Sequence, residues 1–87
     1  MRLKQLIDNI HARCRAARPG ITKADVTAVI KELGAVIQED VVLKADRVNL
    51  PGFGCAFATR LGKNQDHLYA EFNWADAVEA KIREVNG

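Results

Sequence analysis

The sequence predicts a small α+β domain, with a two-helix hairpin followed by a three-stranded antiparallel sheet and a C-terminal helix. Apolar residues recur every three or four positions over residues 3–42 and again near the C-terminus, as along one side of a helix. Residues 48–72 alternate between apolar and polar, as strands do. The chain has 87 residues, which is near the lower limit of length for a chain that forms a stable hydrophobic core by itself. We therefore expect one domain over residues 1–87, completed in a homodimer.

The first apolar stripe predicts a helix that begins near residue 3 and ends near Arg18. Pro19 disfavours helical geometry in the residue before it, and Gly20 breaks the pattern. The stripe consists of Leu3, Leu6, Ile7, Ile10, Cys14 and Ala17.

A second helix is predicted to follow, with Thr22 as its N-cap and Asp25 at the third helical position, where an acid suits the helix dipole. It should run into Val41 or Val42. Gly34 lies inside it, which costs about 1 kcal/mol relative to alanine unless another backbone packs there. Its apolar stripe consists of Val26, Val29, Ile30, Leu33, Val36 and Ile37.

Three strands are predicted before the last helix. The first carries Val48 and Leu50, and Pro51-Gly52 then forms a turn, because proline presets φ and glycine accepts a positive φ. Residues 62–66 form the next turn, and the return strand covers residues 67–72. The middle strand, over residues 55–61, should carry Cys55, Phe57, Thr59 and Leu61 on one face and Ala56, Ala58 and Arg60 on the other.

The last helix is predicted from a further apolar spacing. Asn73 is its expected N-cap, which puts Asp76 at the third helical position. Its apolar side should carry Trp74, Val78, Ile82 and Val85.

The charge of the chain is unevenly distributed. There are 13 Lys and Arg against 11 Asp and Glu, so the net charge is only +2. Asp8 is the single acid of residues 1–23, and acids outnumber bases from Ala24 onward. Such asymmetry is typical of a basic patch for phosphates and equally of a solvated helix face, so both interpretations stay open. The bases of this first part are Arg2, Lys4, Arg13, Arg15, Arg18 and Lys23.

No arrangement typical of catalysis occurs in the sequence. A Gly-rich phosphate loop, a nucleophile with its base and a pair of carboxylates are all missing, so we expect no enzyme, no catalytic residue and no cofactor. His11, Cys14, Cys55 and His67 could in principle supply four zinc ligands. Because Cys14 also fits the apolar stripe, structural cysteines and surface histidines are the favoured interpretation, and no metal site is predicted.

The cysteines and the hydropathy indicate where the protein acts. Two cysteines without a Cys-x-x-Cys spacing suit a reduced, cytoplasmic protein. No apolar run approaches membrane-spanning length, and the N-terminus enters an amphipathic pattern at once. We expect neither a signal peptide nor a membrane partner.

Three short segments carry a resemblance to a known family. Leu6-Ile7-Asp8 lies in the first helix, Ile21-Thr22-Lys23-Ala24-Asp25 opens the second, and Leu50-Pro51-Gly52-Phe53-Gly54 joins two strands. Together, and in this order, they resemble the bacterial histone-like HU and integration host factor family. The predicted order of helices and strands is also that of the family.

The resemblance implies an intertwined homodimer and binding to DNA. It implies a dimer interface at Leu50, Phe53 and Phe57, and a core within one chain is the alternative role of the two phenylalanines. Members of the family grip the minor groove with two long β-arms, each with a proline wedge at its tip that unstacks bases and bends the duplex. A cytoplasmic, nucleoid-associated location is implied as well.

This chain departs from the family at the arm. Only seventeen residues lie between Gly54 and Phe72, enough for two short strands and a tight turn. The turn Gly62-Lys63-Asn64-Gln65 is similar to the family's Gly-Arg-Asn-Pro tip, but Gln65 stands in place of the proline. We therefore expect a shortened β-arm and no intercalative bending. The acidic residues Asp76 and Glu79 also lie near the start of the last helix, where the family has basic residues.

The leading hypothesis is an HU-like protein that contacts the DNA backbone weakly, in a salt-sensitive manner and without sequence preference. The alternative is an arm-less protein-interaction module that does not bind DNA, such as a viral or mobile-element protein that pairs with a cellular HU-type subunit. The role of the cluster Arg13, Arg15 and Arg18 stays open. The candidate DNA-binding residues are Arg2, Lys4, Arg47, Arg60, Lys63 and Asn64, and none is assigned to base readout.

Overall fold

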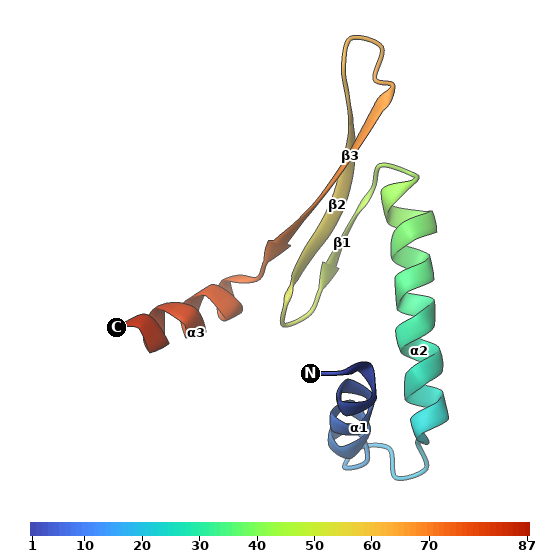
Figure 1. Cartoon of the computed structure of the whole chain (residues 1–87), viewed down its shortest axis with the longest axis vertical. Coiled ribbons are helices and arrows are strands. Elements are labelled where there is room, and N and C mark those ends of the chain that lie inside the picture. The colour runs from blue at the N-terminus through green and yellow to red at the C-terminus, as the bar shows by residue number, and fades with distance from the viewer. The chain divides into compact units, whose positions relative to one another are not determined.

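The computed structural model describes all 87 residues, and its elements follow one another in the predicted order (Figure 1). The chain forms two compact units, the helical hairpin Met1–Ala35 and the sheet unit Val36–Gly87. The α+β class, with a two-helix hairpin, a three-stranded antiparallel sheet and a C-terminal helix, is confirmed. The single domain and the homodimer remain predictions.

The helical hairpin consists of α1, Leu3–Cys14, and α2, Lys23–Val36. Helix α1 ends at Cys14 and not near Arg18, so that prediction is wrong. The Cys14 carbonyl accepts hydrogen bonds from the backbone N–H groups of Ala17 (3.1 Å) and Arg18 (2.8 Å), which close a turn before the proline is reached. Ala17 therefore lies outside the helix.

Helix α2 begins with the predicted N-cap. Thr22 Oγ1 accepts a hydrogen bond from the Asp25 N–H at 3.1 Å, and Asp25 Oδ2 accepts one from the Thr22 N–H at 3.0 Å. Each of these bonds satisfies a backbone N–H group near the start of the helix that would otherwise have no hydrogen-bond partner within the protein. The backbone bond from Thr22, and then the bond with its hydroxyl, lower the pKa of Asp25.

The apolar sides of α1 and α2 meet, as their periodicity predicts. Val26 keeps only 3% of its exposure. Cys14 contributes a free thiol to this apolar contact, in keeping with its place in the stripe. No atom lies within 4 Å of a Cβ built at Gly34, so no backbone of this chain packs there. An apolar hollow of about 230 Å³ between the two helices is lined by Ile10, Cys14, Ile21, Val26, Val29, Ile30 and Leu33.

The sheet unit begins with the π-helix η1, Ile37–Val42, which continues the chain directly from α2. Hydrogen bonds from the Leu43 N–H to the Gln38 carbonyl (3.1 Å) and from the Asp46 N–H to the Val41 carbonyl (2.8 Å) span five residues. The predicted end of this helical stretch at Val42 is confirmed, but its π geometry left no signal in the sequence. The chain then turns at Ala45, whose φ of 52° is in the left-handed region.

Three strands follow, β1 (Arg47–Leu50), β2 (Gly54–Leu61) and β3 (His67–Trp74), in the antiparallel order β1-β2-β3. Ala56 lies opposite Val48 on β1 and opposite Phe72 on β3. These side chains share one face of the sheet, and the residues between them point to the other face.

The core of the sheet unit lies between η1 and β2, which pack against each other. Its buried side chains are Val41, Ala56 and Ala58, at 5%, 9% and 5% exposure. We call the face that carries Ala56 and Ala58 the core face, and the face that carries Phe57 the outer face. The predicted division of the middle strand into two faces is confirmed.

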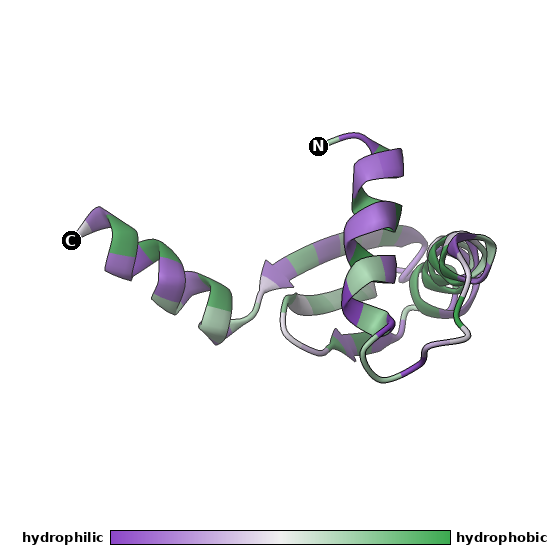
Figure 2. Cartoon of the chain, turned by 90° about the horizontal axis from the view of Figure 1, so that it is seen from below, coloured by the Kyte–Doolittle hydropathy of each residue, from purple (hydrophilic) through white to green (hydrophobic).

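Strand β3 extends two residues further than the sequence predicts. Trp74 still pairs with β2, and the Ala75 N–H donates a hydrogen bond to the Phe53 carbonyl at 2.9 Å. Helix α3, Asp76–Asn86, begins after Ala75 and has no side-chain cap. The prediction that Asn73 caps this helix and that Trp74 lies on it is wrong, because strand pairing extends past Asn73. Apolar and hydrophilic residues alternate around α3 (Figure 2).

Many large apolar side chains remain exposed, and no side chain is less than 2% exposed. One copy of the chain therefore leaves much of its apolar surface in contact with water. None of the helices combines the length and the apolar character that crossing a membrane requires. The exposed apolar residues include Leu3, Val29, Leu33, Phe53, Phe72, Trp74, Ile82 and Val85.

Gly54 is the position at which a side chain should be least tolerated. A Cβ there would collide with the Asn73 carbonyl oxygen and the Phe72 ring. We expect Gly54→Ala to lower the free energy of unfolding by about 1–3 kcal/mol through overpacking, as measured by urea denaturation. Gly20→Ala is the control, because nothing lies within 4 Å of a Cβ at that position. Equal stability of the two variants would contradict the close approach of β3 to Gly54.

The capping bonds of Asp25 predict a pH-dependent contribution to stability. Because its pKa is lowered in the folded state, the carboxylate stabilises the fold above its unfolded pKa of about 3.9, and this stabilisation is lost as the pH falls through the folded pKa. We expect Asp25→Asn to melt at a lower temperature than the wild type at pH 7, and the difference to shrink below about pH 3.9. Glu39→Gln, which removes a carboxylate without a hydrogen bond or ion pair, should show no such trend. A constant difference at all pH values would exclude this linkage.

Candidate nucleic-acid interface

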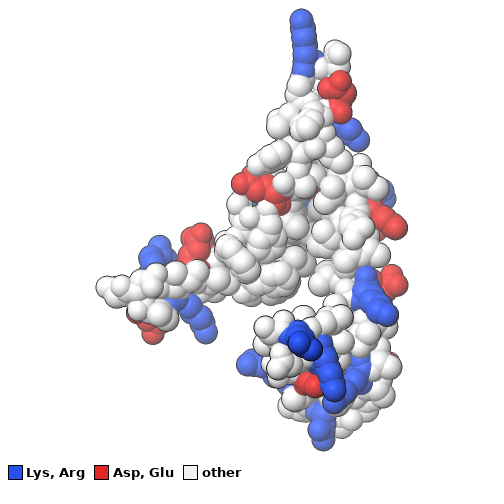
Figure 3. Space-filling model, in the orientation of Figure 1, with Lys and Arg blue, Asp and Glu red and all other residues white.

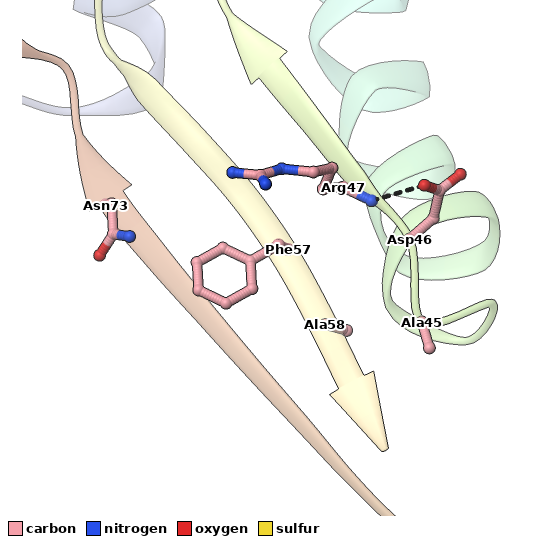
Figure 4. Close-up of a pocket in the computed structure, with 6 residues that line it drawn as sticks. All are labelled: Ala45, Asp46, Arg47, Phe57, Ala58 and Asn73. Atoms are coloured by element: carbon pink, nitrogen blue, oxygen red, sulfur yellow. Dashed lines mark hydrogen bonds between the residues drawn. The ribbon is translucent and has the colours of Figure 1, made fainter. Parts of the chain in front are cut away.

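Arg47 lies on the outer face of the sheet, where β1 runs beside β2. Its register partner is Phe57, and its guanidinium lies 5.9 Å from the centroid of the Phe57 ring. Arg47 Nη2 also donates to Cys55 Sγ at 3.5 Å, and this hydrogen bond raises the pKa of Arg47 above its already high value. These contacts direct the Arg47 side chain across β2 while it remains exposed (Figure 4).

A hollow of about 360 Å³ lies beside Arg47 (Figure 4). It offers one guanidinium, one amide from Asn73 and one aromatic ring. Asp46, whose Oδ1 accepts a hydrogen bond from the Arg47 N–H at 2.8 Å, adds a carboxylate. Since one anion offsets the one cation, the hollow by itself is a poor site for a phosphate. Its lining residues are Ala45, Asp46, Arg47, Phe57, Ala58 and Asn73.

The sheet does not bring its two predicted DNA-binding arginines together. Arg47 shares the outer face with Phe57, whereas Arg60, which lies opposite Leu68, belongs to the core face. Side chains alternate between the faces along a strand, so the two guanidinium groups point in opposite directions. They cannot contact neighbouring phosphates from one face of the sheet.

The tip of the hairpin carries two further predicted residues, Lys63 and Asn64. Both are exposed, and Lys63 makes no ion pair. The turn is closed by a hydrogen bond from the Gln65 N–H to the Gly62 carbonyl at 3.1 Å. Gly62 and Gln65 have positive φ angles of 98° and 54°. The tip is therefore a tight turn that presents one cation.

Arg2 and Lys4 belong to the helical hairpin, at the start of α1. The Arg2 N–H donates to Gln5 Oε1 at 2.9 Å, and both basic side chains are exposed. The two ion pairs of the chain join Lys23 to Asp8 and Lys44 to Asp40, so neither Arg2 nor Lys4 has a carboxylate partner.

The four residues considered as zinc ligands do not come together in the structure. No three His, Cys, Asp or Glu side chains come together where they could hold a metal ion. His11 Nε2 donates to the Ile21 carbonyl at 2.9 Å and so ties α1 to the loop before α2. Cys14 and Cys55 are free thiols.

The predicted dimer-interface residues do not lie on one side of the sheet. Phe53 packs on Phe72 with ring centroids 5.9 Å apart, and Phe72 meets Trp74 edge-on at 5.1 Å. Leu50 shares the core face with Phe72, but Phe57 is on the outer face. The sequence pattern did not predict that Phe72 lies between Phe53 and Trp74. The spacing of two between Phe72 and Trp74 was the available signal, but the predicted strand ended too early to include Trp74.

The sequence matches no protein-family model and no curated protein. Two HU structures nevertheless share its fold. An HU variant from Thermotoga maritima is 24% identical with a TM-score of 0.64, and the match covers 94% of this chain and 99% of that one. An Anabaena HU–DNA cocrystal structure is 22% identical with a TM-score of 0.62, covering 94% and 97%. The fold implied by the sequence resemblance is thus confirmed.

The geometry of the tip predicts how it responds to proline. Proline cannot adopt the φ of 54° found at Gln65, and it lacks the N–H that bonds to Gly62. We expect Gln65→Pro to lower the free energy of unfolding by more than about 1 kcal/mol. Gln65→Gly should equal or exceed the wild type, because glycine adopts a positive φ without strain. Thermal melts followed by circular dichroism would compare the three proteins, and a Gln65→Pro variant as stable as Gln65→Gly would contradict the observed turn.

Proposed function

We propose that this chain is an HU-like nucleic-acid-binding protein that acts as a homodimer and contacts the DNA backbone without sequence preference. The observation that carries the proposal is the fold it shares, over 94% of its length, with an HU protein crystallised with DNA. Binding itself is argued by analogy from that neighbour, since one fold can serve many functions. A cytoplasmic, nucleoid-associated role follows from the same proposal.

The basic residues support contact with the backbone and not with the bases. Arg2, Lys4, Arg60 and Lys63 are exposed and have no carboxylate partner. Exposed guanidinium and ammonium groups suit phosphate oxygens, and phosphate contacts carry no sequence information. With a net charge of +2, the affinity should be modest and sensitive to salt.

The short hairpin supports binding without a wedge. The Ala58 N–H still donates to the Asp46 carbonyl at 2.9 Å, and beyond this bond β2 continues only over Thr59–Leu61. At about 3.3 Å per residue, these residues extend the hairpin by about 10 Å. In its turn, Gln65 has a positive φ of 54°, which proline cannot adopt. We therefore propose that the chain neither reaches along the minor groove nor inserts a side chain between base pairs.

The exposed apolar residues support a homodimer. Phe72 packs against both Phe53 and Trp74, yet Phe53, Phe72 and Trp74 remain 41%, 38% and 58% exposed. Ile82 and Val85 on α3 are 51% and 85% exposed. A second copy that covered these residues would remove from water the apolar area that one copy leaves exposed.

Fluorescence anisotropy with labelled DNA tests the proposed function. We expect duplex, nicked and cruciform DNA to bind at micromolar protein in low salt, with little difference between sequences. The logarithm of the affinity should fall linearly with the logarithm of the salt concentration, by about 0.9 per phosphate contacted. Absence of binding to all three DNA forms at low salt would refute the proposal.

One observation favours a second candidate, a protein-interaction module that pairs with an HU-type subunit. The sheet unit carries eight Asp and Glu against six Lys and Arg, and Asp76 and Glu79 lie in the first turn of α3. Acids at a helix start stabilise the helix but repel phosphate. Native mass spectrometry after co-expression with a full-length HU protein separates the two candidates. Mixed dimers without DNA binding would favour the module, and homodimers alone would count against it.

A further inference from the structure

The excess positive charge of the chain belongs to the helical hairpin. Met1–Ala35 carries seven Lys and Arg against three Asp and Glu, whereas Val36–Gly87 carries six against eight. The two units thus contribute +4 and −2 to the net charge of +2. On the face of the hairpin turned to the viewer in Figure 3, Lys and Arg side chains outnumber Asp and Glu. An anionic partner is attracted to this unit more than to the sheet unit.

Two of the three acids of the hairpin are engaged. Asp8 Oδ1 lies 3.0 Å from Lys23 Nζ, and Asp25 caps α2. The Asp25 carboxylate thereby occupies the start of α2 and also lines the adjacent hollow of about 560 Å³. Neither the helix start nor the hollow is therefore open to an anion, and a phosphate has to be met by exposed side chains.

Arg13, Arg15 and Arg18 do not form one surface, although they are close in the sequence. A helix turns by about 100° per residue, so Arg13 and Arg15 point about 160° apart around the axis of α1. Arg15, with φ of −58° and ψ of −29°, still has helical geometry, whereas Arg18 lies in the loop. Arg15 is eleven positions from Lys4, slightly more than three full turns, so the two share one side of α1. Asp8 belongs to that side as well.

We infer that Lys4, Arg15 and Lys23 form the principal phosphate-binding surface of this chain, which binds along one strand of a DNA duplex. We call these three residues the basic stripe; Lys23 joins it from α2 through its ion pair with Asp8. The inference rests on the proposed function and names the surface that performs it. Lys4 and Arg15 are about 16 Å apart along α1, too far to contact one phosphate, so each contacts a different phosphate of the strand.

The other role open to Arg15 is compensation of the negative end of the helix. Basic side chains in the last turn stabilise a helix in this way. Arg13 lies in the same last turn and is exposed too, so it serves this role as well as Arg15 does. The two arginines differ in the side of α1 that they occupy. Arg13 is therefore the natural control for Arg15.

The first test removes charge from the stripe. In the full-length protein, Lys4→Gln with Arg15→Gln should reduce the slope of log affinity against log salt by about 1–2, because two phosphate contacts are lost. Arg13→Gln with Lys31→Gln removes the same charge from the same unit outside the stripe, and its slope should stay near that of the wild type. Both double variants should melt within a few degrees of each other.

The second test adds charge to the stripe. Asp8→Asn removes its only acid and releases Lys23 from the ion pair, which is exposed and contributes little to stability. We expect tighter binding to duplex DNA than in the wild type at low salt. Glu32→Gln makes the same change in net charge on α2 and should tighten binding less.

The outcomes separate this inference from the proposed function. If the wild type binds no DNA, the proposed function fails. If the wild type binds DNA but each stripe variant binds like its matched control variant, net charge alone governs binding. The inference that the basic stripe is the principal surface is then wrong. If replacing Lys63 and Arg60 by glutamine weakens DNA binding more than replacing Lys4 and Arg15 does, the β2–β3 hairpin is the principal surface. Binding to polyglutamate that depends on the stripe, with none to duplex DNA, would overturn nucleic acid as the partner.

Discussion

One copy of this chain buries few of its apolar residues and leaves most of the large ones exposed, and the rest of the structure depends on this constraint. The core of the sheet unit is small, because Val41 of η1 packs on a strand whose buried residues are the alanines Ala56 and Ala58. Small side chains allow a helix to approach a strand closely, but they remove little apolar area from water, and each square ångström contributes only about 25 cal/mol. Larger residues such as Phe53 and Trp74 each pack against Phe72 and are still exposed to solvent. The residues that would enlarge the core are thus the ones available to a second copy.

Helix α1 combines packing and charge on separate sides. Ile10 and Cys14 line the apolar contact with α2, and Lys4 and Arg15 occupy another side of the same helix. The hydrogen bond between His11 and the loop before α2 holds this arrangement in place. The short hairpin offers no such continuity, because residues on alternate faces of a strand cannot build one basic row. A helix distributes charge along its length more easily than a two-stranded ribbon does, which is why the proposed contact with phosphate lies on α1.

The sequence predicted best what depends on near neighbours. The capping pair Thr22 and Asp25, the alternation along β2 and the turn at Gly52 involve residues only a few positions apart, and all three are found in the structure. Two predicted ends of elements were wrong, one because of a local turn and the other because of pairing with a distant strand. Helix α1 stops at a turn closed by the Cys14 carbonyl, and β3 continues because Gly54 on β2 pairs with Trp74. Sequence periodicity contains no information about those partners.

By itself, therefore, the sequence determined the order of the elements, the cap of α2, the turns, and which residues alternate along β2, because local backbone preferences act within a few residues. Only the tertiary structure decided how these elements are used. It decided that the alanine face of β2 meets η1, that Phe72 and Trp74 join Phe53, and that Phe57 stays with Arg47 on the outer face. The physical reason is that the two faces of an isolated strand are equivalent until register and a packing partner distinguish them.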